Sequence, residues 1–226
     1  MRARNFPGRL LLGLVLMLIA ASAMLFLTAI AANNDEIARA EPAEILPQLQ
    51  EAYEQATEQV DFPVLLPTSV PGLGTEFWLA GLMFANSYGP ANEGVTEDSS
   101  LHYEFSVDTQ DGCGGSGACS SGSIGGEVVT AGTQPIEAIH SYVDDYLNNP
   151  DSLPMSAEPM GIVELSGGRE GIVVPWVATA QCTEARVYWE QPFGDETYRY
   201  YVGIECGDRA DVVALANNVI ANTEGF

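Results

Sequence analysis

The sequence predicts an α+β fold: a curved antiparallel sheet with helices packed on one face, preceded by one transmembrane helix. Segments with the alternation or turn boundaries of strands outnumber those with the three- and four-residue spacing of helices. An uncharged apolar stretch lies near the N-terminus, and 226 residues suffice for one ordinary domain behind it. A hydrophobic content of 46% also supplies enough apolar side chains for a substantial core.

The apolar stretch extends from Leu10 to Ala32 without a charged side chain. A helix of this length is roughly 34 Å long and can cross a hydrocarbon core about 30 Å thick. Three arginines precede the stretch and the first acid, Asp35, follows it, so we expect the N-terminal end to stay in the cytoplasm. The alternative is a secretory signal peptide, because an Ala-x-Ala pattern ends at Ala31. Either route exports the rest of the chain.

The stretch divides the chain into four predicted parts. They are a short cytoplasmic tail (1–9), a transmembrane anchor or signal segment (10–32), a linker with an amphipathic helix (33–60), and an extracytoplasmic α+β domain (61–226). The predicted location is therefore membrane-anchored and facing the periplasm or exterior, or secreted if the segment is cleaved after Ala31.

The charge of the chain limits the classes of partner that it is expected to bind. The net charge is −23, and all eight basic residues are arginine. Three of these arginines precede the apolar stretch, so the exported part sets five arginines against all 31 acids. Such a field repels nucleic acid and anionic lipid headgroups, which excludes nucleic acid as an expected partner. It favours cations, basic partners or simply solubility, including solubility in saline surroundings.

The remaining secondary structure follows from periodicity and turn residues. Strands are expected at Glu76–Ser87, Leu101–Asp108, Ser123–Thr130, Gly161–Leu165, Gly171–Trp176, Glu184–Glu190 and Thr197–Glu205. Helices are expected from Pro42 to Val60, at Pro135–Leu147 and at Arg209–Ala221, the last capped by Asp208. The proline-bearing segment Phe62–Leu73 is expected to run extended along a sheet edge.

Four cysteines, an even number in an exported domain, predict two disulfides. Cys113 and Cys119 bracket a flexible glycine-rich loop and are expected to pair, which leaves Cys182 to pair with Cys206. The cysteines lack the Cys-x-x-Cys spacing of zinc sites, so no metal site is predicted from them.

The last hairpin leaves two strand registers open. A turn centred on Gly194 places Cys182 opposite Cys206 but puts the apolar side chains of the two strands on opposite faces. A shift of one residue reunites the apolar sets and separates the cysteines, and a bulge beside a cysteine would satisfy both requirements.

Catalytic motifs are missing from the sequence. It contains no phosphate loop, dinucleotide fingerprint, HExxH motif or nucleophile elbow, and no motif supports His102 or His140 as the base of a serine triad. Asp108 and Asp111 beside the cysteine loop could hold calcium, but the EF-hand spacing is missing and a solvated loop is the simpler interpretation. We therefore predict no catalytic residue, no metal and no cofactor.

Aromatic residues crowd the last predicted hairpin and suggest a binding surface. They are Tyr188, Trp189, Tyr198, Tyr200 and Tyr201. Most are expected to form the core or cross-strand pairs, but they occupy both parities, so some must face away from the core. An exposed tyrosine row there is the predicted binding surface.

The cysteine loop carries a family resemblance, in the pattern Cys113-x-Gly115-x-x-Ala118-Cys119-x-x-Gly122. With LLPTSVP at 65–71, a Trp-bearing strand at 187–189 and a closing helix at 215–218, it resembles uncharacterised exported proteins common in cyanobacteria. More loosely, the order of elements is similar to sensor domains of anti-sigma factors and to lipoprotein-carrier folds. The chain departs in its second cysteine pair, which the family would place close together in sequence. The resemblance implies a compartment and a fold but no reaction.

The predicted function is a non-enzymatic, membrane-tethered or secreted module that binds a protein or small-molecule ligand through its sheet. The membrane itself is an expected partner through Leu10–Ala32. One alternative is an extracytoplasmic hydrolase with an acidic site. The other is the sensor part of a membrane signalling system, which the short tail before Arg9 disfavours.

Overall fold

The computed structural model describes residues 42–81, 102–131, 133, 135–136, 161–176 and 182–223. The apolar stretch Leu10–Ala32 lies outside these ranges, as does the predicted helix Pro135–Leu147 beyond Ile136. Within the described ranges, no helix has the length and apolarity needed to cross a bilayer.

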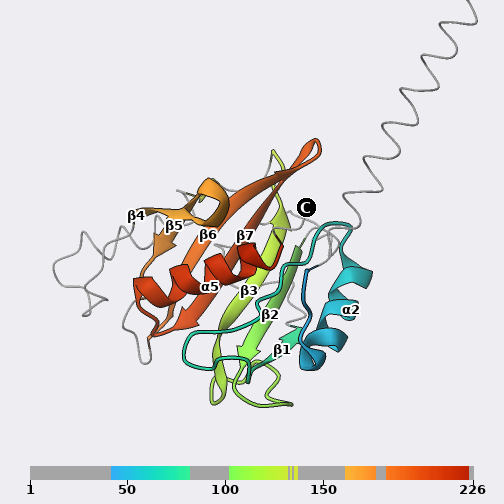
Figure 1. Ribbon diagram of the computed structural model, residues 1–226, viewed down its shortest axis with the longest axis vertical. Helices are drawn as coiled ribbons and strands as arrows, with labels where there is room; N and C mark the ends of the chain where they lie inside the picture. Colours follow the sequence, from blue (N-terminus) through green and yellow to red (C-terminus); the bar gives the residue numbers. More distant parts are fainter. Residues whose placement is uncertain are drawn as a thin grey trace, which may run out of the picture. The chain divides into compact units, whose positions relative to one another are not determined.

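Seven antiparallel strands of the described residues form one sheet in the order β1-β2-β3-β7-β6-β5-β4 (Figure 1). Their bounds are β1 Trp78–Gly81, β2 His102–Asp108, β3 Ser120–Val128, β4 Gly161–Leu165, β5 Arg169–Val174, β6 Glu184–Phe193 and β7 Glu196–Glu205. The sheet confirms the predicted α+β class with an antiparallel sheet, because each expected strand has a counterpart among them.

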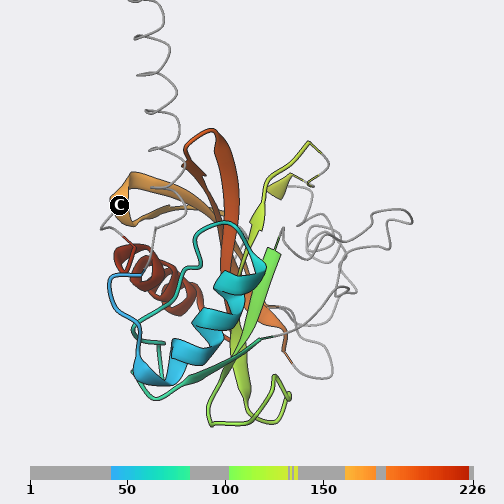
Figure 2. The same ribbon diagram turned by 90° about the vertical axis from the view of Figure 1, so that its right-hand side faces the viewer.

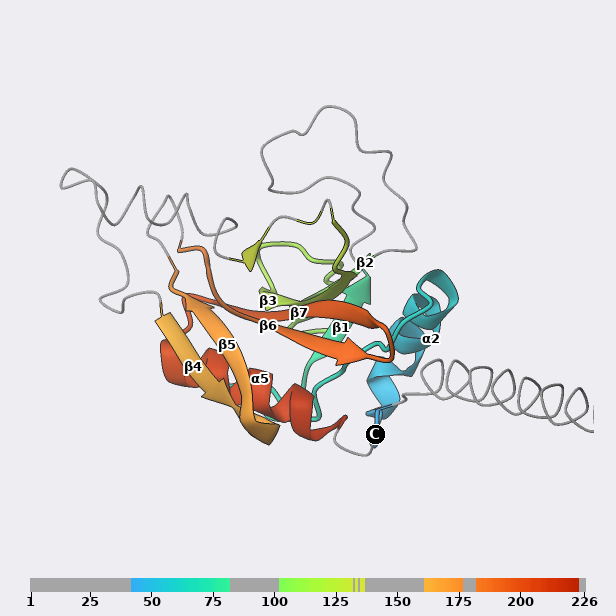
Figure 3. The same ribbon diagram turned by 90° about the horizontal axis from the view of Figure 1, so that it is seen from above.

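Two helices pack on the same face of this sheet (Figures 2 and 3). The first, α2 at Gln50–Gln59, follows a single 3-10 turn, η1 at Pro47–Leu49, so it begins later than the predicted start at Pro42. The second, α5, spans Arg209–Ala221 as predicted. Its cap is also confirmed, because the Asp208 carboxylate accepts a hydrogen bond of 2.9 Å from the backbone N–H of Asp211.

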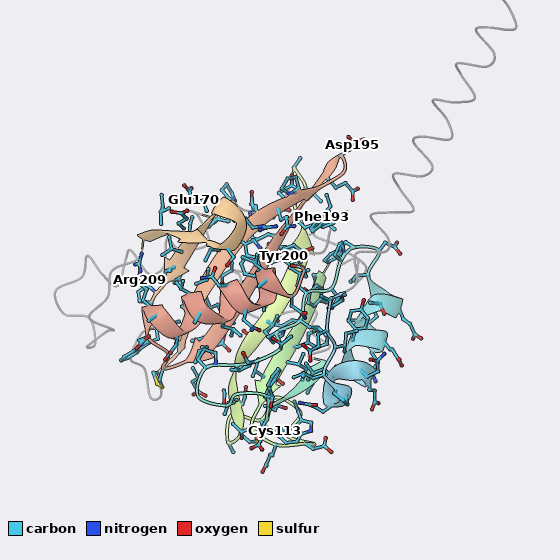
Figure 4. All side chains as sticks on the ribbon, in the orientation of Figure 1. Cys113, Glu170, Phe193, Asp195, Tyr200 and Arg209 are labelled. Atoms are coloured by element: carbon cyan, nitrogen blue, oxygen red, sulfur yellow. A yellow bond between two sulfur atoms is a disulfide. The ribbon has the colours of Figure 1, made fainter. Side chains whose placement is uncertain are left out.

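The hydrophobic core lies between the sheet and these helices. Large side chains of β6 and β7 reach it, and the rings of Trp189 and Tyr200 stack with their centroids 5.8 Å apart. Figure 4 labels Tyr200 close to one end of α5, and Asp195 at the tip of the β6–β7 hairpin. Burial of these aromatic rings supplies much of the apolar surface that stabilises the fold.

The segment Phe62–Leu73 corrects one prediction. It does not follow a sheet edge but crosses the helix side of the sheet, where most of its side chains are buried. The backbone N–H of Leu65 donates to the hydroxyl of Tyr103 at 2.9 Å, and the hydroxyl of Tyr200 donates to the carbonyl of Pro63 at 3.1 Å. Tyrosine hydroxyls therefore form the hydrogen bonds that these backbone groups would otherwise form with a neighbouring strand, which the prolines prevent.

The apolar side chains decide the register of the last hairpin. Ala185 pairs with Ile204 and Val187 pairs with Val202, so these four side chains share the core face. The register centred on Gly194 is therefore wrong, and the one-residue shift is correct. A slip by one residue would turn the whole buried set toward the other face, a larger cost than any adjustment at the strand ends.

Both predicted disulfides are nevertheless present. Cys182 and Cys206 are bonded with their Cα atoms 5.3 Å apart, and Cys113 and Cys119 with theirs 6.1 Å apart. Cys206 has a φ of 54°, a left-handed conformation rare outside glycine, while its N–H donates to the carbonyl of Thr183. This left-handed residue after β7, rather than a bulge within the paired strands, reconciles the disulfide with the apolar register. Two disulfides indicate an oxidising, extracytoplasmic setting.

Candidate functional site

The face of the sheet that is turned away from α2 and α5, called here the outer face, carries polar side chains at the positions that alternate with the core. Along β6 and β7 these are Glu184, Arg186, Tyr188, Glu190, Arg199 and Tyr201. On β2 and β3 they are His102, Glu104, Ser106, Asp108, Ser123 and Glu127. The outer face is the candidate functional site because two of its carboxylates, Glu127 and Glu190, are about 40% exposed.

The five aromatic residues of the predicted binding surface separate by parity. Trp189, Tyr198 and Tyr200 are at most 2% exposed and belong to the core, so they cannot form an exposed row. Tyr188 and Tyr201 lie on the outer face, where their ring centroids are 5.6 Å apart. Cross-strand pairing explains the division, because side chains at odd and even positions of a strand point to opposite faces. Tyr188 is nevertheless buried, at 8% exposed, and packs with Val174 in a small second cluster on this face, so the prediction of a binding surface continues only for the half-buried Tyr201.

A buried guanidinium joins two half-exposed carboxylates across three strands. The Arg199 side chain is 2% exposed, and it donates to Glu127 at 3.0 Å and to Glu190 at 2.8 Å. Burial raises the pKa of the Glu127 carboxyl, and the nearby Arg199 charge opposes this shift. The two carboxylates are about 40% exposed while one guanidinium serves both, so the group carries a net negative charge toward solvent.

A second cluster surrounds Arg186. Its guanidinium lies 4.9 Å from the centre of the Tyr201 ring, and its Nε donates to Glu184 at 2.7 Å. Burial lowers the pKa of Arg186, but the Glu184 carboxylate and the hydroxyls of Tyr188 and Tyr201 outweigh this effect and raise it overall. The guanidinium is therefore a fixed positive charge, held by one carboxylate and one aromatic face.

Two glycines make room for this cluster. A Cβ at Gly125 would lie 2.5 Å from the Tyr201 ring, and a Cβ at Gly203 would overlap the carboxylate of Glu184. Because both positions lack a side chain, Glu184 reaches across β7 and accepts a hydrogen bond of 2.6 Å from the Ser123 hydroxyl on β3. The sequence contains these glycines, but only the strand register shows that Gly125 leaves space for the Tyr201 ring and Gly203 leaves space for the Glu184 side chain.

Tyr201 serves as a donor on this face. Burial raises the pKa of its hydroxyl well above the ordinary range, and the carboxylate of Glu104, which accepts its hydrogen bond, raises it further. The phenol therefore stays protonated at physiological pH and cannot act as a base. Together with Arg186 and Arg199, it gives the outer face fixed donors beside fixed carboxylates, an arrangement suited to recognition.

The described part of the chain contains no cluster of three or more His, Cys, Asp or Glu side chains arranged to hold a metal ion. His102 lies on the outer face opposite Glu127 in the register, and His140 lies outside the described residues. Apart from the outer face, an open groove of about 290 Å³ lies where the turn Val70–Leu73 meets the start of β3 and the end of β7 at Cys206.

Comparison with known proteins does not assign this site. The chain matches no protein-family model, no curated protein and no solved structure. The sequence reasoning named Tyr188 and Tyr201, which lie on this face, but did not single out the Arg199 group. Arginine is scarce in this chain, since only four arginines follow Arg39. Two of these four occupy outer positions of the last hairpin, and this concentration could have pointed to the group of Arg199.

Proposed function

We propose that this chain is an extracytoplasmic binding module that holds a basic protein segment against the outer face of its sheet. The domain would be tethered through Leu10–Ala32 or secreted after cleavage. The observation that carries the proposal is the group of Arg199, Glu127 and Glu190, in which half-exposed carboxylates outnumber the one buried cation that binds them.

Charge complementarity supports a basic partner. Apart from the buried Asp108, the outer positions of β2, β3, β6 and β7 carry five acids, Glu104, Glu127, Glu184, Glu190 and Glu205, against the two arginines Arg186 and Arg199. A partner's arginine or lysine would bind the solvent-facing carboxylates of Glu127 and Glu190. The net charge of −23 would also accelerate the encounter with a cationic segment.

A binding titration tests the proposal on the full chain in a non-ionic detergent. The probe is a fluorescent, arginine-rich peptide of about twelve residues, followed by anisotropy at low and at physiological salt. We expect Glu190→Gln to weaken binding about five- to tenfold, because one outer carboxylate is lost while Glu127 keeps Arg199 paired. The matched control is Glu54→Gln, which removes one exposed carboxylate from α2 and should change the affinity less than twofold.

Equal losses of affinity in the two variants would show non-specific attraction to an acidic protein and would overturn the proposal. Zero-length coupling of carboxylates to lysines of a second, lysine-bearing peptide gives an independent measurement. The proposal expects the coupled carboxylates to be those of β2, β3, β6 and β7, whereas coupling confined to α2 would contradict it.

A further inference from the structure

A buried carboxylate lies at the end of β2, beside the loop closed by Cys113 and Cys119. Asp108 is 1% exposed, whereas Asp111, three residues later in the same loop, is exposed. The interpretation of both as solvated loop residues therefore fails for Asp108. In Figure 4 the label Cys113 marks this end of the sheet.

The carboxylate of Asp108 is only half satisfied. Its Oδ2 accepts a hydrogen bond of 3.2 Å from the backbone N–H of Gly115, but its Oδ1 is buried without a hydrogen-bond partner. The hydroxyl of Ser106 is also buried without a partner, and the residue is 2% exposed. The two side chains are two positions apart on β2 and therefore point to the same face. Two buried, unsatisfied oxygens on the same face of one strand indicate a missing electropositive partner.

The described residues do not supply that partner as a charged side chain. Four arginines follow Arg39, and none of them forms a hydrogen bond with the Asp108 Oδ1. Arg186 binds Glu184, Arg199 binds Glu127 and Glu190, Arg169 binds Gln191, and Arg209 binds the carbonyl of Ile162. His102 begins β2, at the opposite end of the strand from Asp108. A buried carboxylate without a cation is expensive, so an external cation is the simplest completion of this site.

We propose that Asp108 and Ser106 bind a hard divalent cation, for which calcium is the probe, beneath the disulfide loop of Cys113 and Cys119. The Asp108 Oδ1 and the Ser106 hydroxyl supply two of the six to eight oxygens that calcium takes, and backbone carbonyls and water supply the others. With a single carboxylate the affinity should be on the order of 10⁻⁴–10⁻³ M, the range of extracellular calcium modules. The site is independent of the proposed binding of a basic segment, and either can fail alone.

The melting temperature of the full chain, measured with and without calcium, tests this site. Chelator-treated protein in detergent is titrated with calcium chloride to about 10 mM, against sodium chloride of equal ionic strength. We expect calcium to raise the melting temperature of the wild type by about 3–6 °C with saturation, and sodium chloride to raise it much less. Asp108→Asn should abolish the calcium-specific rise, and the matched control Asp111→Asn should retain it.

Two further readouts separate a cation site from a purely structural role. In chelator, Asp108→Asn should melt at or above the wild-type temperature, because it removes an uncompensated buried charge while its amide oxygen still accepts from Gly115. Ser106→Ala should keep the fold and raise the calcium concentration of half-effect several-fold. The proposal is overturned if Asp108→Asn responds to calcium as the wild type does, if it melts far below the wild type in chelator, or if calcium has no specific effect on the wild type.

Discussion

On each face of the sheet a tyrosine ring packs over a glycine of the neighbouring strand, but the surroundings of the two rings differ. On β3 and β7, Gly126 lies opposite Tyr200 and Gly125 lies opposite Tyr201. Each tyrosine ring covers the glycine across from it, within 2.9 Å of the place where a Cβ would stand. Tyr200 does this inside the core and is completely buried, whereas Tyr201 does it on the outer face beside charged groups.

This difference shows what each face is built to do. The hydroxyl of Tyr200 is fixed by the Pro63 carbonyl, and apolar side chains surround its ring, so its contribution is to stability. The ring of Tyr201 instead lies under the guanidinium of Arg186, and its hydroxyl donates to Glu104. One Gly–Tyr pair therefore stabilises the fold, and the neighbouring pair positions the charged groups that the proposed binding of a basic segment would use.

The largest expected effect comes from removing the two rings separately. Tyr200→Ala should lower the free energy of unfolding by about 3–5 kcal/mol, because it opens a large cavity in the core. Tyr201→Ala should cost about half as much or less, because its ring borders partly exposed polar groups. Urea denaturation of both variants gives the two values. Equal losses would mean that the outer face is as tightly packed as the core and would remove the distinction between the faces.

A smaller effect is expected from filling the glycine positions. In Gly126→Ala the new methyl group would meet the buried rings of Tyr103 and Tyr200 at 2.7–2.9 Å, and neither ring can move away. Overpacking of this kind costs about 1–3 kcal/mol. Gly125→Ala meets only the Tyr201 ring, which is less deeply buried than the rings of Tyr103 and Tyr200 and can shift more easily, so its cost should be about 1 kcal/mol.

Near-ultraviolet circular dichroism and peptide binding separate the two glycine variants further. Gly125→Ala should perturb the tyrosine signal and weaken binding of the basic peptide, since the displaced ring no longer supports Arg186. A Gly125→Ala variant that binds the peptide normally would show that the seat of Tyr201 is irrelevant to recognition.

The helix face was largely predictable from the sequence and the outer face was not. Alternation such as that of Tyr103, Phe105 and Val107 directly reports burial, and the cap at Asp208 marks the start of α5, so these elements follow from local patterns. The partners of Arg199 come from β3 and β6, and they depend on a register that the sequence left open between two choices. Charge pairs across strands become visible only when that register is known.

The course of Phe62–Leu73 was unpredictable for a related reason. A segment interrupted by prolines has no period, so the sequence indicates an extended backbone but not the surface on which it lies. Its location depends on a hydrogen bond to the hydroxyl of Tyr103 and on one from the hydroxyl of Tyr200, two residues that are distant in sequence. The buried state of Asp108 has a similar origin, because the glycine-rich loop that covers it has no pattern of its own.

The smallest expected effect is a pH dependence of the stability that Glu127 contributes. It shows whether burial of this carboxyl or its ion pair with Arg199 has the larger effect on its pKa. Burial raises the pKa of this carboxyl above its ordinary value of 4.5 despite the Arg199 charge, so the folded protein binds the proton more tightly than the unfolded chain does. The stability that Glu127 contributes relative to Gln is therefore complete below about pH 4.5, and it is lost as the pH rises through the raised pKa. Because the side chain is 40% exposed, the change should not exceed about 1 kcal/mol.

Urea midpoints of the wild type and Glu127→Gln between pH 4 and 8 measure this difference. The same comparison in an Arg199→Gln background should move the loss to higher pH, because the charge that opposes the shift is gone. A wild-type advantage that grows with pH would mean that the ion pair with Arg199 outweighs burial. The outer face would then resemble the core, stabilised by its own contacts, rather than a surface whose carboxylates remain available to a partner.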